Sequence, residues 1–378
     1  MDLLKSYFPE LIQCAATTYL AFAVFIACFR VPETDTYNPY RRSKRLLSAA
    51  LMVISVNLFA WMAMYDGDWT HLKPSNEILD MLLFFLAGLL LSFCFGNLLD
   101  SNYLSRRRVT LSVGVWLVAV AAGCASLLPE LSRAGVWLAV AAESLFLGFT
   151  VHFIYGLQRL YRRRDMMLDK YFTNDMHHVI RWILMSIILI VMLGVISVAT
   201  LFMGPLGNWV SQIYIISTIC YIAVSFVNYA TKYAIIAKAG EEIDEDEQKA
   251  TETTCEEPAG AKPQATPVEV RIEQRLAEWM STKAYVKEQF TISDLALTLG
   301  TNRYTLSRYI NSRYKMNFST WISSMRIEEA ERLIKENPDE SLENISALSG
   351  FSSLSYFSKV FSRMEGMAPT VWRSKTVA

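Results

Sequence analysis

Seven stretches of the sequence are long enough and apolar enough to cross a lipid bilayer as helices. A spanning helix needs about 20 mostly apolar residues, because the hydrocarbon core is ~30 Å thick and a helix rises ~1.5 Å per residue. The runs lie near residues 10–29, 46–64, 78–99, 109–128, 136–158, 182–203 and 209–231. Residues 1–239 are therefore predicted to form a seven-helix transmembrane bundle.

Lys and Arg are concentrated in alternate loops between these runs. The loops after the first, third, fifth and seventh runs hold Arg30, Arg41, Arg42, Lys44, Arg45, Arg106, Arg107, Arg108, Arg162, Arg163, Arg164, Lys170, Arg181, Lys232 and Lys238. The opposite side holds only Lys5, Lys73 and Arg133. Basic loops stay on the cytoplasmic side of a membrane. This pattern predicts a multi-pass protein of a prokaryotic inner membrane, with its N-terminus outside and its C-terminus in the cytoplasm.

Two ionisable residues stand out inside the fifth run, Glu143 and His152. An ionisable group at membrane depth is a candidate functional site, so both are candidate signal-sensing residues. The alternative is that they and the polar residues of other runs form hydrogen bonds that hold the bundle together. Nine residues separate the pair, which places them on opposite faces of a helix and ~13 Å apart along its axis.

Residues 240–267 form an acidic stretch with nine Asp or Glu and two Lys. Such a segment buries too little apolar surface to fold alone, so we expect a disordered linker. The negative charge of this linker would hold the tail away from anionic surfaces. The alternative is that the linker is only a solvated spacer.

The tail from residue 268 onward changes to short amphipathic helices. Residues 291–311 read as a helix capped by Ser293, a turn at Gly300, and a second helix capped by Asn302. This is the pattern of a helix-turn-helix unit, whose second helix enters the major groove. The outward-facing residues of that helix are Arg303, Tyr304, Ser307 and Arg308.

The same pattern returns after a connecting helix at residues 318–336, which we expect Ser319 to cap. Within residues 341–373, Gly350 marks a turn, Ser353 caps a helix and Gly366 ends it. The outward-facing residues of this second helix are Leu354, Ser355, Ser358 and Lys359. The tail thus predicts two helix-turn-helix units in an all-helical domain over residues 268–378.

The tail resembles the AraC/XylS family of transcriptional regulators. The residues that carry the resemblance are Ile292, Leu295, Ala296, Leu306, Ser307, Arg308, Arg326, Ile327, Ala330, Leu333, and the string from Gly350 to Arg373. The resemblance implies that both second helices enter the major groove on one face of the DNA. It also implies base contacts by Tyr304, Ser307 and Arg308 from the first, and by Leu354, Ser355, Ser358 and Lys359 from the second. Most members carry a soluble ligand-binding barrel where this chain has seven apolar runs, so the resemblance implies no particular effector.

Together these features predict a membrane-bound, sequence-specific transcription factor that responds to a signal at the membrane. Its partners would be double-stranded DNA, the lipid bilayer, a second copy in a homodimer, and an unknown signal or ligand. We expect no enzymatic activity or cofactor, because no apolar run contains an HExxH motif, a nucleophile elbow or a P-loop. We expect no metal, because five of the six cysteines lie in apolar runs without metal-ligand spacing. The alternatives are a transporter or membrane enzyme with a DNA-binding tail, or a membrane domain that only anchors the tail.

Overall fold

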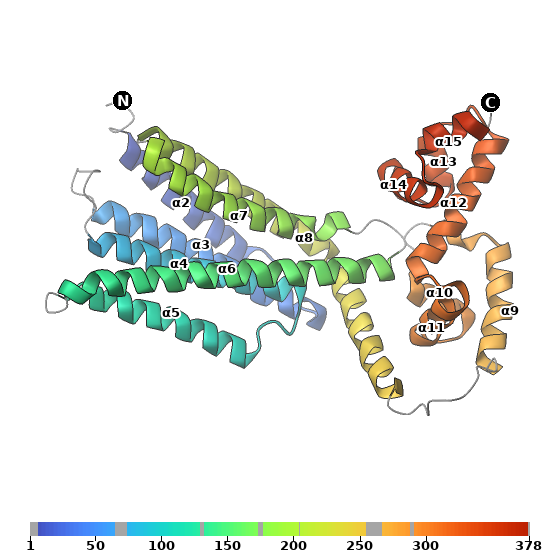
Figure 1. Cartoon of the computed structure of the whole chain (residues 1–378), viewed down its shortest axis with the longest axis horizontal. Coiled ribbons are helices and arrows are strands. Elements are labelled where there is room, and N and C mark those ends of the chain that lie inside the picture. Colours follow the sequence, from blue (N-terminus) through green and yellow to red (C-terminus); the bar gives the residue numbers. More distant parts are fainter. Residues whose placement is uncertain are drawn as a thin grey trace. The chain divides into compact units, whose positions relative to one another are not determined.

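The computed structural model describes residues 7–64, 74–128, 132–172, 177–203, 205–254, 267–287 and 291–376. Within these ranges the chain is built from helices and contains no strand, which confirms the predicted all-helical fold class. Two compact units are distinguished, residues 1–164 with 179–235 and residues 165–178 with 236–378. Figure 1 labels the helices of both units.

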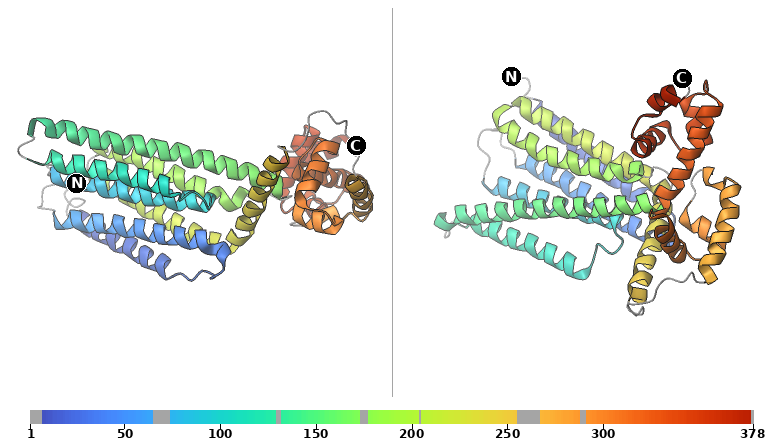
Figure 2. Two further views of the ribbon diagram at one scale, coloured as in Figure 1. Left: turned by 90° about the horizontal axis from the view of Figure 1, so that it is seen from below. Right: turned by 45° about the vertical axis from the view of Figure 1, so that its right-hand side comes forward.

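The N-terminal unit is a bundle of long apolar helices that run alongside one another (Figure 2). They are α2 (Phe8–Cys28), a 3-10 turn η1 (Asp35–Tyr37), α3 (Asn38–Ala63), α4 (Pro74–Leu99), α5 (Arg106–Ser126), and most of α6 (Ser132–Tyr171), α7 (His177–Met203) and α8 (Pro205–Thr254). Among the described residues, six of these helices are long and apolar enough to cross a membrane. In α7 the described apolar stretch, Val179–Leu193, is shorter. The count of seven spans therefore stays a prediction.

Small side chains allow α2 and α3 to approach closely. The Ser55 hydroxyl on α3 donates a hydrogen bond to the Ala16 carbonyl on α2 (2.7 Å), and Ser48 donates to the Ala23 carbonyl (2.8 Å). Both alanines are fully buried. Small and hydroxyl-bearing residues are the usual means of helix association in an apolar surrounding, where hydrophobicity alone provides little driving force.

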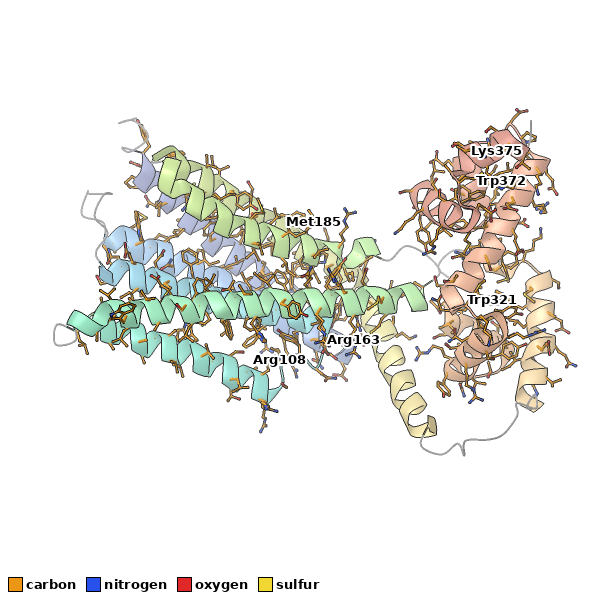
Figure 3. The ribbon with its side chains drawn as sticks, viewed as in Figure 1. Arg108, Arg163, Met185, Trp321, Trp372 and Lys375 are labelled. Carbon is orange, nitrogen blue, oxygen red and sulfur yellow. The ribbon has the colours of Figure 1, made fainter. Side chains whose placement is uncertain are left out.

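Two basic residues near the N-terminal ends of α3 and α5 bind backbone carbonyls of the preceding segment. The Lys44 ammonium donates to the carbonyls of Ala27 (3.0 Å) and Phe29 (2.8 Å) at the carboxyl end of α2. Arg108 donates to the Tyr103 carbonyl (2.7 Å) and lies over the Tyr103 ring. Arg108 and Arg163, labelled in Figure 3, lie toward the same end of the bundle. That placement agrees with the loop pattern from which the orientation was predicted.

Residues 240–254 differ from the expectation of a disordered linker. Helix α8 continues through Thr254, so this part of the predicted linker is helical. Extending a helix that already exists adds one hydrogen bond per residue and avoids the cost of nucleation, which explains how an acidic segment can continue it. Residues 255–266 lie outside the described residues.

The C-terminal unit contains a short-helix domain. Its elements are α9 (Pro267–Ser281), the 3-10 turn η3 (Ala284–Val286), α10 (Ile292–Leu299), α11 (Arg303–Tyr314), α12 (Phe318–Glu336), α13 (Leu342–Leu348), α14 (Leu354–Glu365) and α15 (Pro369–Thr376). Helix α12 runs between the pair α10–α11 and the group α13–α15 (Figure 1). The connecting helix and both helix pairs thus occur where the sequence predicted them.

Two predicted N-caps were wrong by two residues. Thr291, rather than Ser293, caps α10, because its side chain accepts from the Asp294 amide while the Asp294 carboxylate accepts from the Thr291 amide. This reciprocal pair satisfies two backbone amides, whereas a single serine cap satisfies only one. Asn317, rather than Ser319, caps α12 through the Thr320 amide, and Ser319 is buried inside the helix.

A tryptophan anchors each half of the domain, and both are labelled in Figure 3. Trp321 at the start of α12 stacks on Trp279 of α9, with ring centroids 6.2 Å apart. Trp372 of α15 meets Phe361 of α14 edge-on at 5.7 Å. Around Phe361, α12, α13 and α14 contribute a cluster of buried aromatic and aliphatic side chains. One connecting helix therefore carries two separate cores.

Candidate nucleic-acid interface

The two helix pairs have the local geometry of helix-turn-helix units. The turn after α10 is made by Gly300, at φ +65°, and Asn302 then caps α11 by accepting from the Thr305 amide (2.8 Å). The turn after α13 contains Gly350, at φ +87°, and Ser353 caps α14 by accepting from the Tyr356 amide (3.2 Å). Both glycines adopt a left-handed backbone that other residues rarely take. The predicted turns and both predicted caps are confirmed.

Helices α11 and α14 are built in the same register. Leu306 and Ile310 of α11 are fully buried, and so are Phe357 and Phe361, which lie 51 positions later on α14. The eight predicted DNA-contacting residues follow the same spacing: Arg303, Tyr304, Ser307 and Arg308 correspond in order to Leu354, Ser355, Ser358 and Lys359. The two sets therefore occupy equivalent places on the two helices.

None of these eight residues belongs to the buried core. Arg308, Leu354, Ser355 and Lys359 are exposed, whereas Arg303, Tyr304, Ser307 and Ser358 are half-buried. Exposed and half-buried positions on the second helix of each unit are the places from which side chains reach base edges. The placement is compatible with the predicted role, and contact with DNA stays a prediction.

The two faces differ in charge. Between Arg303 and Lys315 there are four basic residues and no acidic one, whereas α14 has Lys359 and Arg363 followed by Glu365. Burial raises the pKa of Tyr309, and the Glu273 carboxylate raises it further. The first helix therefore presents the more positive surface to a polyanion.

Glu329 ties α12 to the residues just before η3. Its carboxylate accepts from Lys283 (3.0 and 2.9 Å) and from Arg332 (2.6 and 3.1 Å). Hydrogen bonds from Arg332 and then Lys283 lower the pKa of Glu329 to about 2. Sequence analysis did not single out this network, because Lys283 and Glu329 are 46 positions apart and only the fold brings them together.

Glu331, two residues further along α12, behaves in the opposite way. Burial raises its pKa, and the nearby Glu365 carboxyl of α14 raises it further. A like charge at short range disfavours the ionised form. The stabilities contributed by Glu329 and Glu331 therefore respond to pH with opposite signs.

The structure does not bring together Glu143 and His152, the candidate signal-sensing residues of the N-terminal unit. Glu143 and His152 both lie on exposed positions of α6 rather than in the interior of the bundle. An acidic side chain that does contact another helix is Asp80 of α4, which accepts a short hydrogen bond from the buried Asn57 amide of α3. Asp80 is an acidic residue inside the third apolar run, which is the signal that could have identified it.

A second polar contact inside the bundle involves Asn97, which is fully buried. Its amide donates to the Pro39 carbonyl (2.6 Å) and to the Ser43 hydroxyl (2.9 Å), and Ser43 donates to the Cys94 carbonyl (3.1 Å). These contacts hold α3 and α4 together. This part of the bundle therefore uses its polar groups in the way the structural alternative predicted.

The comparisons with known proteins concern only the C-terminal part of the chain. A family model described as a helix-turn-helix domain matches residues 295–375. Among solved structures, the chain is similar to the C-terminal domain of AraT, a response regulator from Geobacillus stearothermophilus, at 22% identity, covering 31% of this chain and 91% of that chain with a TM-score of 0.27. No curated protein matches the chain. Residues 295–375 therefore form a helix-turn-helix domain, which supports DNA as a partner.

Proposed function

We propose that this protein is a membrane-bound transcription regulator that binds double-stranded DNA in a sequence-specific manner. The observation that carries the proposal is the pair of helix-turn-helix units built in one register on a shared connecting helix. Two such units read successive major grooves, whose centres are about 34 Å apart along one face of the duplex. Arg303, Tyr304, Ser307 and Arg308 contact DNA from α11, and Leu354, Ser355, Ser358 and Lys359 contact it from α14.

The apolar helices hold the regulator in a prokaryotic inner membrane, where the chromosome is within reach of a cytoplasmic tail. The basic loops support the orientation with the N-terminus outside, because Lys and Arg are retained on the cytoplasmic side. In this proposal the membrane unit senses a signal and changes how two copies associate. Pairing of copies would raise the effective concentration of one tail near another on adjacent DNA sites.

Selection from random DNA tests the binding function. Full-length protein in lipid nanodiscs should enrich a two-part motif whose parts lie about one helical turn apart. Replacing Arg308 and Lys359 together by Ala should abolish the enrichment, whereas replacing Arg271 and Lys375, which removes the same charge elsewhere on the domain, should preserve it. Absence of any enriched motif with the unaltered protein would refute the proposal.

Reporter fusions test the orientation. Reporters joined after Arg107 and Arg163 should show cytoplasmic activity, and reporters joined after Arg133 and Gly207 should show external activity. A tail on the external side would refute the regulatory function, because the chromosome would be out of reach.

A further inference from the structure

The segment from Ile272 to Lys287, which we call the brace, touches the turns of both helix-turn-helix units. It comprises most of α9 together with η3. The family match begins at residue 295, so the brace lies outside the matched domain. Its buried residues Ile272, Leu276 and Trp279 nevertheless place it in the core of the same unit. What the brace contacts decides whether it is more than a covering helix.

At the first turn, the brace acts through Arg275. Its guanidinium donates to the Leu299 carbonyl at the end of α10 (2.8 Å). A methyl group added at Gly300 would lie 2.5 Å from an Arg275 nitrogen, so the guanidinium is seated against the turn itself. The carboxyl end of a helix leaves carbonyls unpaired, and a cation there is favourable. Arg275 therefore fixes the turn that precedes α11.

At the second turn, the brace acts through its backbone. A methyl group added at Gly350 would lie 2.4 Å from the Val286 carbonyl oxygen and 2.7 Å from its carbonyl carbon. Backbone atoms cannot swing aside as the end of a long side chain can. The turn that precedes α14 therefore rests directly on η3.

Arg326 of α12 holds the brace in that position. It is fully buried, and it donates to the carbonyls of Tyr285 (2.7 Å) and Lys287 (2.8 Å) on either side of Val286. Its guanidinium also lies 5.9 Å from the centre of the Phe351 ring, beside the second turn. A buried charge is tolerated only when its donors are paired, and the carbonyls of the brace provide partners for this one.

We propose that the brace sets the disposition of the two helix-turn-helix units relative to each other, and that Arg275 and Arg326 are positioning residues for DNA binding. The inference rests on the proposed DNA-binding function. Helix α12 joins the two units along one line of contact, and the brace joins their turns along a second. Two lines of contact fix the angle between the two units, whereas a single line of contact leaves that angle free to vary. A fixed angle lets the second unit bind without a further search once the first is bound.

The test measures how much the second unit adds to binding. Full-length protein in nanodiscs is titrated with the DNA selected as above, and with the same DNA carrying one scrambled half. Arg275→Ala should lower the affinity ratio of complete to half site about tenfold, whereas Arg271→Ala, an exposed arginine on the same helix, should leave it within about twofold. Circular dichroism at the assay temperature checks that each variant is folded.

A glycine pair provides the second comparison. Gly350→Ala should lower the ratio further, because the methyl group displaces Val286. Gly366→Ala is the matched control: its φ is +70°, and no atom lies within 4 Å of the added methyl group. If Gly350→Ala does not fold, the comparison of Arg275→Ala with Arg271→Ala tests the role of the brace.

A folded Arg275→Ala variant with the same ratio of complete-site to half-site affinity as the unaltered protein would refute the proposed role of the brace. The proposed DNA-binding function would not be affected by that result. Failure of the unaltered protein to select any DNA would overturn the proposed function, and the brace with it.

Discussion

The two helix-turn-helix units share a register but are built from different side chains. The first packs α11 through Leu306, Tyr309 and Ile310, and its outer face is basic. The second packs α14 through Tyr356, Phe357, Val360 and Phe361, and it exposes Leu354 where the first has Arg303. Equivalent backbone geometry therefore presents two outer faces of different chemistry. We expect the first unit to supply charge-assisted contacts, and the second to supply apolar contacts such as those with thymine methyl groups.

The largest difference between the two units should be in how much each core contributes to the free energy of unfolding. Phe357 and Leu306 occupy equivalent, fully buried positions. Phe357→Ala should lower the free energy of unfolding by about 3–5 kcal/mol, and Leu306→Ala by about 2–4 kcal/mol, because the larger side chain leaves the larger cavity. Urea denaturation of fragment 267–378, which should fold alone because it contains α9 and both cores, measures both. Equal losses would show that the second core relaxes around the cavity.

The second largest difference should be in how the outer faces of α11 and α14 contribute to DNA affinity. Arg308 can donate two hydrogen bonds to guanine, so Arg308→Ala should cost about 1–3 kcal/mol on the selected site and less on random DNA. Lys359→Ala, at the equivalent position, should weaken binding to both DNAs more evenly, because lysine is a point charge. Titrations at several salt concentrations separate the two cases. An equal loss on both DNAs for Arg308→Ala would make it a phosphate contact.

Glu329 and Glu331 of α12 predict a pH dependence of stability. The lowered pKa of Glu329 means that its stabilisation is present above about pH 4.5 and is lost as the pH falls toward 2. Glu329→Gln should therefore lower the free energy of unfolding at pH 7 by about 1–2 kcal/mol. It should also make stability depend less on pH at acidic pH. Glu331→Gln should raise stability at pH 7, because its raised pKa reflects an unfavourable charge. Thermal unfolding from pH 3 to 8 measures both, and the same sign for both variants would contradict this assignment.

The smallest effects should come from the helix caps. Asn302→Ala and Ser353→Ala each remove one acceptor for a helix amide, and each should cost about 1 kcal/mol. Asn302→Gly and Ser353→Gly should each lower the free energy of unfolding by only about a few tenths of a kcal/mol. Denaturation of fragment 267–378 measures the difference. A loss confined to one unit would show that the other cap is replaced by water.

Local patterns allowed most of the C-terminal fold to be predicted. Glycine at the turns, Asn302 and Ser353 at the caps, and the apolar spacing of the helices each act over a few residues. The two misplaced caps show where such reasoning fails. Thr291 and Asp294 form a reciprocal capping pair three residues apart, and that pair outweighs the single hydroxyl of Ser293.

Contacts between distant segments could not be predicted. Arg326 meets carbonyls about 40 positions earlier, and no local pattern marks those carbonyls as its partners. The exposed positions of Glu143 and His152 likewise depend on which face of α6 packs inward, and the even spread of apolar residues around a membrane helix does not reveal that face. Both remain candidates for sensing a signal.

In the proposed membrane arrangement, the contact between Asn57 and Asp80 has a consequence for how the chain is made. A carboxylate at the start of an apolar segment makes that segment harder to insert, because the insertion machinery must release it toward lipid. Ribosomes synthesise α3 before α4, so Asn57 has already emerged when Asp80 follows. The amide can therefore receive the acid as soon as the two helices meet, and α3 and α4 should leave the translocation channel as a pair.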